Sequence, residues 1–387
     1  NQSSGTTTVT RTNFHTPSYR YEAAYITLAS GVLTVTNNNF ATSERAIHVN
    51  GGTLTIANNN FNDTFHAVYL RGNVTLTNNG GNTGTGDVYL SYAELRRDSM
   101  LSNDLVVTIG DYASIATGAT LTIPSGSIIK LTPYARMDVS GTLIVGDTSA
   151  TTTFTTLTDD SLGGDTNRDG INTLQPYNYW GYININPGAI AEFTNTTIHY
   201  AGNFFSNGTS ETGTLINSGG SLSLTNSMLN ENRNAGLQHN AGTTTIINSA
   251  ITNNANGIIV RGGALTIHNS AIHDNVIYGI RNYPSTILDA TNNWWGSATG
   301  PTHSTNPTGT GDRVSDNVTF TPWLLQEPST TTTPTVCVTE CYSNVLFLPG
   351  AEASRLYRPQ FGFDKQLWLP DLINPRTEEL FLNATGT

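Results

Sequence analysis

The sequence predicts an all-β protein in which most of the chain forms a right-handed parallel β-helix. The expected solenoid has turns of about 20–22 residues. Two observations predict it. The stretch "GVLTVTNNNF" (31–40) recurs as "GTLTIANNNF" (52–61), a shift of 21 residues. The chain between such matches consists of short alternating runs separated by Asn, Gly and Ser, and no window holds the 3.6-residue period of a helix.

The repeat continues along the chain and fixes the expected strands. "NVTLTNN" (73–79) follows the second copy, and "SLSLTNSML" (221–229), "TTTIINSAI" (243–251) and "ALTIHNSAI" (264–272) follow later. Segments this short cannot all pair as hairpins, whereas a coil adds one strand to each of several parallel sheets at every turn. Alternation then predicts inward side chains stacked about 4.8 Å apart. These are Leu33, Val35, Leu54, Ile56, Val74 and Leu76.

Asparagines mark the expected corners of the coil. They occur at 37–39, 58–60 and 78–79, and again at Asn226, Asn248 and Asn269. Asn tolerates left-handed backbone angles, and its amide both donates and accepts hydrogen bonds. Stacked asparagines are therefore expected to form structural ladders along the coil axis.

Composition narrows the class of protein. Charged residues make up 12% of the chain and the net charge is −11. An acidic chain without a basic patch is a poor ligand for nucleic acid or for an anionic membrane. No apolar run is long enough to span a bilayer. Low charge, few lysines and abundant Thr and Asn favour an extracellular or cell-surface protein.

Three segments depart from the repeat. The predicted β-helix covers 1–326, with an inserted loop at about 158–179 and less even spacing between 92 and 215. Trp294, Trp295 and Trp323 are expected to seal the end of the coil. A Pro/Thr-rich linker follows at 327–336, and a short segment of different character occupies 337–387.

The inserted loop carries the strongest chemical signal. "DDSLGGDTNRDGINT" presents oxygen ligands with the alternate spacing of a calcium loop, ahead of a glycine that permits a sharp turn. The expected ligand at the far end of such a loop is replaced by Pro176, so another carboxylate must contribute. A structural Ca²⁺ site is therefore predicted, with solvated carboxylates in a turn as the alternative. Its candidate ligands are Asp165, Asn167, Asp169, the carbonyl of Ile171, and Asp159 or Asp160.

An outward column is the second candidate site. If the neighbouring aliphatic residues point inward, His48, Tyr69 and Tyr89 stack on the outside, following Thr27. Such a column can stack sugar rings or contact a partner protein. Stabilisation of the sheet, or coverage by the inserted loop, is the alternative that the pattern favours.

The coil resembles the bacterial right-handed β-helix proteins of the pectate-lyase-like superfamily. "TNNWWG…GP…GTGD…VSDNV…PWL" is similar to their closing turn. The resemblance covers roughly 1–325 and implies fold more than activity. No G-H-G element occurs, and the late Arg261 and Arg281 lie several turns from the acidic loop, so a carbohydrate-active β-helix stays an alternative.

The last segment suggests a second resemblance. "SNVLFLPGAEASRLYRPQFGFDKQLWLPDLINPRTEELFLN" (343–383) is similar to the start of lecithin:cholesterol acyltransferase-like α/β-hydrolases. That likeness implies oxyanion-hole amides at Pro349, Gly350 and Ala351. The chain has no G-x-S-x-G, so it would be the β-helical front of a longer enzyme. Cys337 and Cys341 are expected to close a local loop in an oxidising compartment.

A non-catalytic structural rod is the predicted function. The first strand-like run begins almost at the first residue, which predicts an open sheet edge at the start of the coil. The open edge and the short C-terminal tail together favour fibre assembly over a monomeric adhesin. The expected partners are other copies of the chain, or glycans. N-glycosylation is permitted at seven sequons, namely Asn1, Asn62, Asn73, Asn195, Asn207, Asn317 and Asn383.

Overall fold

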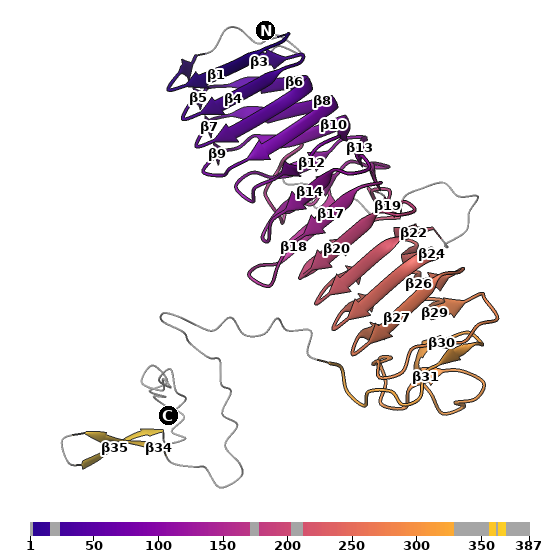
Figure 1. Ribbon diagram of the computed structural model, residues 1–387. Helices are drawn as coiled ribbons and strands as arrows, with labels where there is room; N and C mark the ends of the chain where they lie inside the picture. Colours follow the sequence, from indigo (N-terminus) through magenta and orange to yellow (C-terminus); the bar gives the residue numbers. More distant parts are fainter. Residues whose placement is uncertain are drawn as a thin grey trace. The chain divides into compact units, whose positions relative to one another are not determined.

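The computed structural model describes residues 3–15, 24–170, 178–202 and 212–328, and the backbone of 356–360 and 363–368. Contacts divide the chain into two units, Asn1–Thr332 and Thr333–Thr387. The described part of the first unit contains no helix and winds into a parallel β-solenoid of about 12 turns (Figure 1). The predicted all-β solenoid is confirmed.

Three faces run along the coil, and strands pair in parallel from one turn to the next. The first sheet contains β3 (Ala24–Leu28), β6 (Ser43–Ala57), β8 (Thr64–Asn78), β10 (Asp87–Leu95), β12 (Val107–Ile109), β15 (Ile128–Leu131), β18 (Thr152–Thr156), β21 (Thr196–His199), β23 (Met228–Asn230), β25 (Ala250–Thr252) and β28 (Ala271–His273). The second sheet contains the end of β10, then β13 (Tyr112–Ile115), β16 (Arg136–Val139), β19 (Ile183–Ile185), β22 (Gly213–Thr225), β24 (Ala235–Ile247), β26 (Asn256–Val260) and β29 (Tyr278–Asn282).

The third sheet contains β1 (Thr6–Thr10), β4 (Val32–Thr36), the ends of β6 and β8, β11 (Ser99–Met100), β14 (Thr120–Ile123), β17 (Thr142–Val145), β20 (Ile190–Thr194), the ends of β22 and β24, and β27 (Ala264–His268). Long strands such as β6 turn a corner and belong to two faces. A small sheet of β2 (Asn13–Phe14), β5 (Asn39–Phe40), β7 (Asn60–Phe61) and β9 (Thr83–Gly84) completes the first turns.

The uneven spacing after residue 92 has a structural cause. In the next turn, two separate strands pair with the last segment of β8. Leu95, at the end of β10, pairs with Val74, whereas Met100 of β11 pairs with Thr77. The turns from β12 to β21 therefore have three distinct short strands, whereas β22 and β24 again run through a corner and belong to two sheets.

The core is a continuous stack of aliphatic columns. The six residues predicted to point inward are at most 1% exposed. Leu33 pairs with Leu54, and Leu54 pairs with Leu76 in the following turn. Phe40 and Phe61 stack in the same way, with ring centroids 5.1 Å apart. Removing these side chains from water supplies the main stabilisation of the coil.

Asparagines occupy the corners, as predicted. Asn37, Asn58, Asn226, Asn248 and Asn269 all have φ between 50° and 57°. The ladder itself is formed by neighbouring buried amides: Asn38 donates to Asn59, and Asn59 donates to Asn82. Asn82 ends this chain of donors on the carboxylate of Asp104.

A second ladder has the same form near the other end of the coil. Asn232 donates to Asn254, Asn254 to Asn275, and Asn275 to Asp312. Each ladder therefore ends on a carboxylate, which accepts without needing to donate. Burial of Asp312 raises its pKa to about 6.

Residues 284–328 follow the last turns of the coil. They form the short pairs β30 (Leu288–Asp289) with β33 (Val318–Thr319), and β31 (Pro301–Thr302) with β32 (Gly311–Arg313). Trp295 is fully buried here, and Trp323 packs partly against the core. The structure thus places two of the three tryptophans against the core.

In the second unit the structure describes one antiparallel hairpin, β34 (Leu356–Gln360) with β35 (Phe363–Trp368). Cys337, Cys341, Pro349, Gly350 and Ala351 lie outside the described residues. Within the described chain, no helix has the length and apolar character needed to cross a membrane.

Candidate metal centre

The inserted loop crosses the outer surface of the first sheet. Residues 157–170, called the strap below, leave β18 and run back over earlier turns. The Gly164 carbonyl accepts a hydrogen bond from Lys130 Nζ at 2.5 Å. Farther along, Arg168 Nη2 donates to the Thr64 carbonyl at 2.8 Å, across 104 residues of sequence. The strap therefore links β18, β15 and β8.

Glycine permits the close approach of the strap to the sheet. A Cβ at Gly163 would lie 2.6 Å from Val106 Cγ2, and φ there is +65°. A larger residue would clash and would also be strained in this backbone conformation. The strap is thus held by shape as well as by the hydrogen bonds of Lys130 and Arg168.

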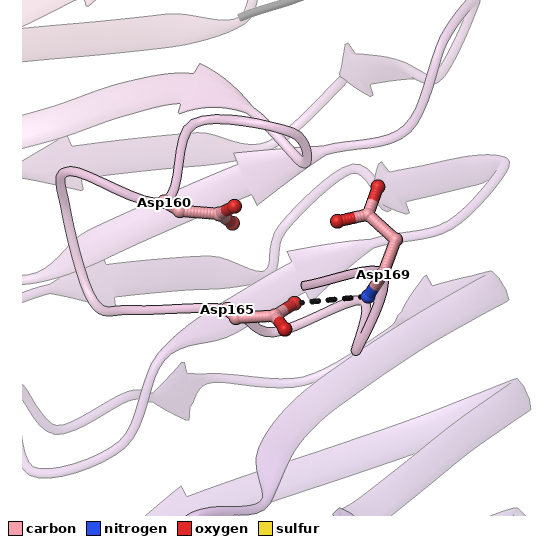
Figure 2. A group of neighbouring side chains, drawn as sticks. All are labelled: Asp160, Asp165 and Asp169. Carbon is pink, nitrogen blue, oxygen red and sulfur yellow. Dashed lines mark hydrogen bonds between the residues drawn. The ribbon is translucent and has the colours of Figure 1, made fainter. Parts of the chain in front are cut away.

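Three carboxylates of the strap lie together. Ligand atoms of Asp160, Asp165 and Asp169 are all within 4.8 Å of one another. Figure 2 shows Asp160 directed toward the side of the loop that carries the other two. Asp165 accepts hydrogen bonds from the backbone N–H of Asp169 at 3.2 Å and of Gly170 at 3.0 Å, which closes the turn. Like charges this close repel unless a cation or a proton lies between them.

Asp160 differs from its two neighbours in one respect. Both of its carboxylate oxygens are shielded from solvent, and neither has a hydrogen-bond partner among the described residues. Loss of hydration raises the pKa of Asp160, and the charge of Asp165 raises it further. A shielded carboxylate without partners is costly, so this side chain is set up to accept a cation or a proton.

Lys130 supplies a positive charge beneath the strap. It is fully buried on β15, and burial lowers its pKa, although the charge of Asp160 opposes that effect. Its ammonium bonds to the Gly164 carbonyl, and no described carboxylate lies within ion-pair distance of it. Asp160, Asp165 and Asp169 together provide carboxylates whose negative charge a divalent cation would offset.

The other predicted ligands are placed differently. Asp159 is 2% exposed and faces the sheet, where it accepts from Thr155 Oγ1 at 2.7 Å. Asn167 remains in the turn, and its amide donates to Asp169 Oδ2 at 2.8 Å. Ile171 lies outside the described residues. The structure therefore brings together Asp160, Asp165, Asn167 and Asp169, and separates Asp159 from them.

The predicted column of rings is present on the first sheet. His48 pairs in register with Tyr69, and Tyr69 with Tyr89. The tyrosine rings stack with centroids 5.3 Å apart. Arg45 lies over Tyr69, with its guanidinium carbon 4.0 Å from the ring centroid. All three residues of the column are half-buried, so part of each ring is already used in contacts within the protein.

Beside this column lies a pair that the sequence reasoning missed. His66 Nδ1 and Asp87 Oδ1 are 2.7 Å apart, and both residues are buried. They are 21 residues apart, which is one repeat, so a search for ionisable residues at that spacing would have found them. Lys130 was missed too, although it is one of only two lysines in the chain and lies in an apolar strand.

The sequons differ in accessibility. Asn62, Asn73 and Asn317 are exposed, whereas Asn195 is 6% exposed and occupies a corner of the coil. Asn1, Asn207 and Asn383 lie outside the described residues. Of the described sequons, Asn195 is the one that a glycan could not reach without local opening.

Comparison of the chain with protein-family models, with curated proteins and with solved structures finds no match. The assignment of the solenoid fold therefore rests on the structure itself and not on similarity to another protein. The resemblances to the pectate-lyase-like superfamily and to acyltransferase-like hydrolases remain predictions.

Proposed function

We propose that this chain is a non-catalytic structural rod whose strap is fixed by one bound divalent cation, with Ca²⁺ the best fit. The observation that carries the proposal is Asp160, whose two shielded oxygens have no hydrogen-bond partner among the described residues although they lie beside two further carboxylates. A cation there would supply the missing interactions and tie the two ends of the strap together.

The chemistry of the donors favours Ca²⁺. Every candidate ligand is an oxygen atom, which suits a hard cation, and an exposed loop can adjust to the irregular geometry that Ca²⁺ accepts. Mg²⁺ demands a stricter octahedron and would be bound less well by such a loop. Asn167 Oδ1 and the carbonyl of Ile171 are the predicted additional ligands.

The use of the ionisable side chains supports a structural role. His66 bonds to Asp87 under the strap, and Asp159 bonds to Thr155. Asp104 and Asp312 end the two amide ladders. These groups stabilise corners and contacts between turns, and Asp312 in addition lines a surface pocket with His273, Asp274 and Arg313.

The proposal also covers where the rod is found and how copies of it associate. We place the rod outside the cell, where it would space, adhere or assemble. Within the described residues β1 pairs with β4 along one edge, and no described strand pairs with its other edge. That edge supports end-to-end association into fibres. Electron microscopy with Ca²⁺ and with chelator tests it: ordered fibres are expected, and single short rods under both conditions would contradict it.

Calorimetric titration of the chelated protein with Ca²⁺ tests the cation site. We expect one binding event, weaker binding of Mg²⁺, and no binding to Asp160→Asn. Glu192→Gln removes the same charge from an exposed position on β20 and should bind Ca²⁺ as the original chain does. Absence of Ca²⁺ binding, or equal binding by Asp160→Asn, would overturn the site.

Thermal unfolding provides the linked measurement. Free Ca²⁺ at about a hundred times its dissociation constant should stabilise the protein by about 2.7 kcal/mol. Without Ca²⁺, Asp160→Asn should unfold at a higher temperature than the original chain, because it removes a shielded charge that has no hydrogen-bond partner among the described residues. A lower unfolding temperature of this variant in chelator would contradict the account.

A further inference from the structure

From the outer face of the third sheet we infer that two copies of this chain pair side by side through it. The inference rests on the proposed role as a structural rod. Side chains at the outward positions of this sheet form registered columns parallel to the coil axis. The central column is unbroken from β1 to β27. It contains Thr8, Thr34, Thr55, Thr77, Met100, Thr122, Ile144, Glu192, Ser223, Thr245 and Thr266.

The chemistry of this face is almost entirely hydroxyl and methyl. Glu192 is the one charged residue in the central column, in a chain whose net charge is −11. A flanking column adds Thr6, Val32, Thr53, Thr75, Thr120, Thr142, Ile190, Ser221, Thr243 and Ala264, and its one charged member is Asp98, beside Thr120. Two acidic rods repel over most of their surfaces, and a face with so little charge is where they can approach.

Exposed aliphatic side chains also gather here. Within the described strands, the large aliphatic residues that are exposed are Val32 (38%), Met100 (40%), Ile190 (41%) and Ile247 (38%). All four point outward from the third sheet, in β4, β11, β20 and β24. A β-branched, uncharged sheet surface of this kind is what packs against another sheet in a sandwich.

The size and period of the face suit a second copy. Ten steps between strands of about 4.8 Å, and a width of five residues at about 3.3 Å, give roughly 50 by 16 Å, or about 800 Å². That is about the area each partner buries in a stable protein–protein interface. Because both copies have the same axial repeat, columns of one rod can lie between columns of the other along the whole length.

Two other occupants fit less well. A polysaccharide would be expected to stack on aromatic rings, and these two columns contain none. The strap lies over the first sheet, where Gly164 and Arg168 make their contacts, so it does not occupy this face. The strap therefore covers the first sheet between β8 and β18, and these contacts leave the third sheet to a partner.

Sedimentation velocity over a hundredfold range of protein concentration, with Ca²⁺ present, tests the pairing. We expect a monomer–dimer equilibrium in the original chain. Thr55→Lys and Ser223→Lys place a charge in the centre of the face and should weaken the dimer at least tenfold. Ser114→Lys makes the same kind of change on the second sheet, beside Asp138, and should leave the dimer unchanged.

The outcomes separate this inference from the proposed function. A monomer at every concentration would overturn the pairing, and so would a dimer that both face variants retain. Circular dichroism of each variant shows whether it is folded. A monomer that still binds Ca²⁺ at Asp160 would leave the cation-fixed rod in place. A dimer that does not bind Ca²⁺ would support the pairing and overturn the cation site.

Discussion

Replacing Asn59 by Ala should destabilise the coil more than replacing its neighbour Asn60. The buried Asn59 amide donates to the Val35 carbonyl at 2.9 Å and to Asn82 Oδ1 at 3.1 Å. Its own oxygen accepts from the backbone N–H and the amide of Asn38, both at 3.0 Å. The substitution therefore removes four hydrogen bonds and leaves buried partners unsatisfied. At about 1 kcal/mol each, the expected loss is about 4 kcal/mol.

The expected change in melting temperature follows from chain length. With an unfolding entropy of about 2.1 cal/mol/K per residue over a unit of roughly 330 residues, 4 kcal/mol corresponds to about 6 °C. Asn60 is exposed, and its amide makes two exposed hydrogen bonds: it donates to Asn39 at 2.9 Å and accepts from Thr83 Oγ1 at 3.3 Å. Asn60→Ala should therefore shift the melting temperature by less than about 1 °C.

Thermal unfolding followed by far-ultraviolet circular dichroism compares the two variants. If Asn59→Ala melts within a degree of the original chain, or together with Asn60→Ala, the buried ladder does not stabilise the corners as the hydrogen bonds imply. A second transition confined to Asn59→Ala would show that the first turns unfold separately, as nearest-neighbour coupling in solenoids allows.

Three further predictions concern buried polar groups. Burial lowers the pKa of His239 from 6.5 to about 4, so the unfolded chain binds more protons than the folded chain between these pH values. The free energy of unfolding should therefore fall as the pH falls, by up to about 3 kcal/mol. In denaturant titrations at several pH values, His239→Gln should flatten this pH dependence, and an unchanged dependence would count against the assignment. Lys130→Met removes the hydrogen bond to Gly164, so proteolysis within the strap should accelerate while the coil stays folded, and an unchanged cleavage rate would show that Lys130 does not hold it. Thr108→Val removes a buried hydroxyl that has no partner among the described residues, so it should be neutral or stabilising by up to about 1 kcal/mol, and a clear loss of stability would reveal a hydrogen bond there.

The repeat made much of the fold predictable. A shift of 21 residues places Leu33 on Leu54 and His48 on Tyr69, and the structure has these pairs in register. Periodic side chains report their neighbours directly, because each residue meets its equivalent one turn later. The positive φ values of Asn37 and Asn58 follow from the same logic, since every turn needs a corner.

The strap was predictable as an insertion, but its position was not. It has no counterpart one repeat away, so its place depends on single long-range contacts such as Arg168 with Thr64. The choice between Asp159 and Asp160 depends on which side of the strap each carboxylate faces. Asp159 turns toward Thr155 and the sheet, and Asp160 turns toward Asp165. Sequence spacing could not distinguish these adjacent residues.

The most direct test of the cation-fixed rod is hydrogen–deuterium exchange with Ca²⁺ and with chelator. We predict that amides of residues 157–170 are protected with Ca²⁺ and exchange rapidly after chelation. The core strands, such as β14 and β17, should exchange slowly in both conditions. Equal exchange of the strap with and without Ca²⁺ would contradict the account, because a strap that needs no cation would leave Asp160 without its proposed partner.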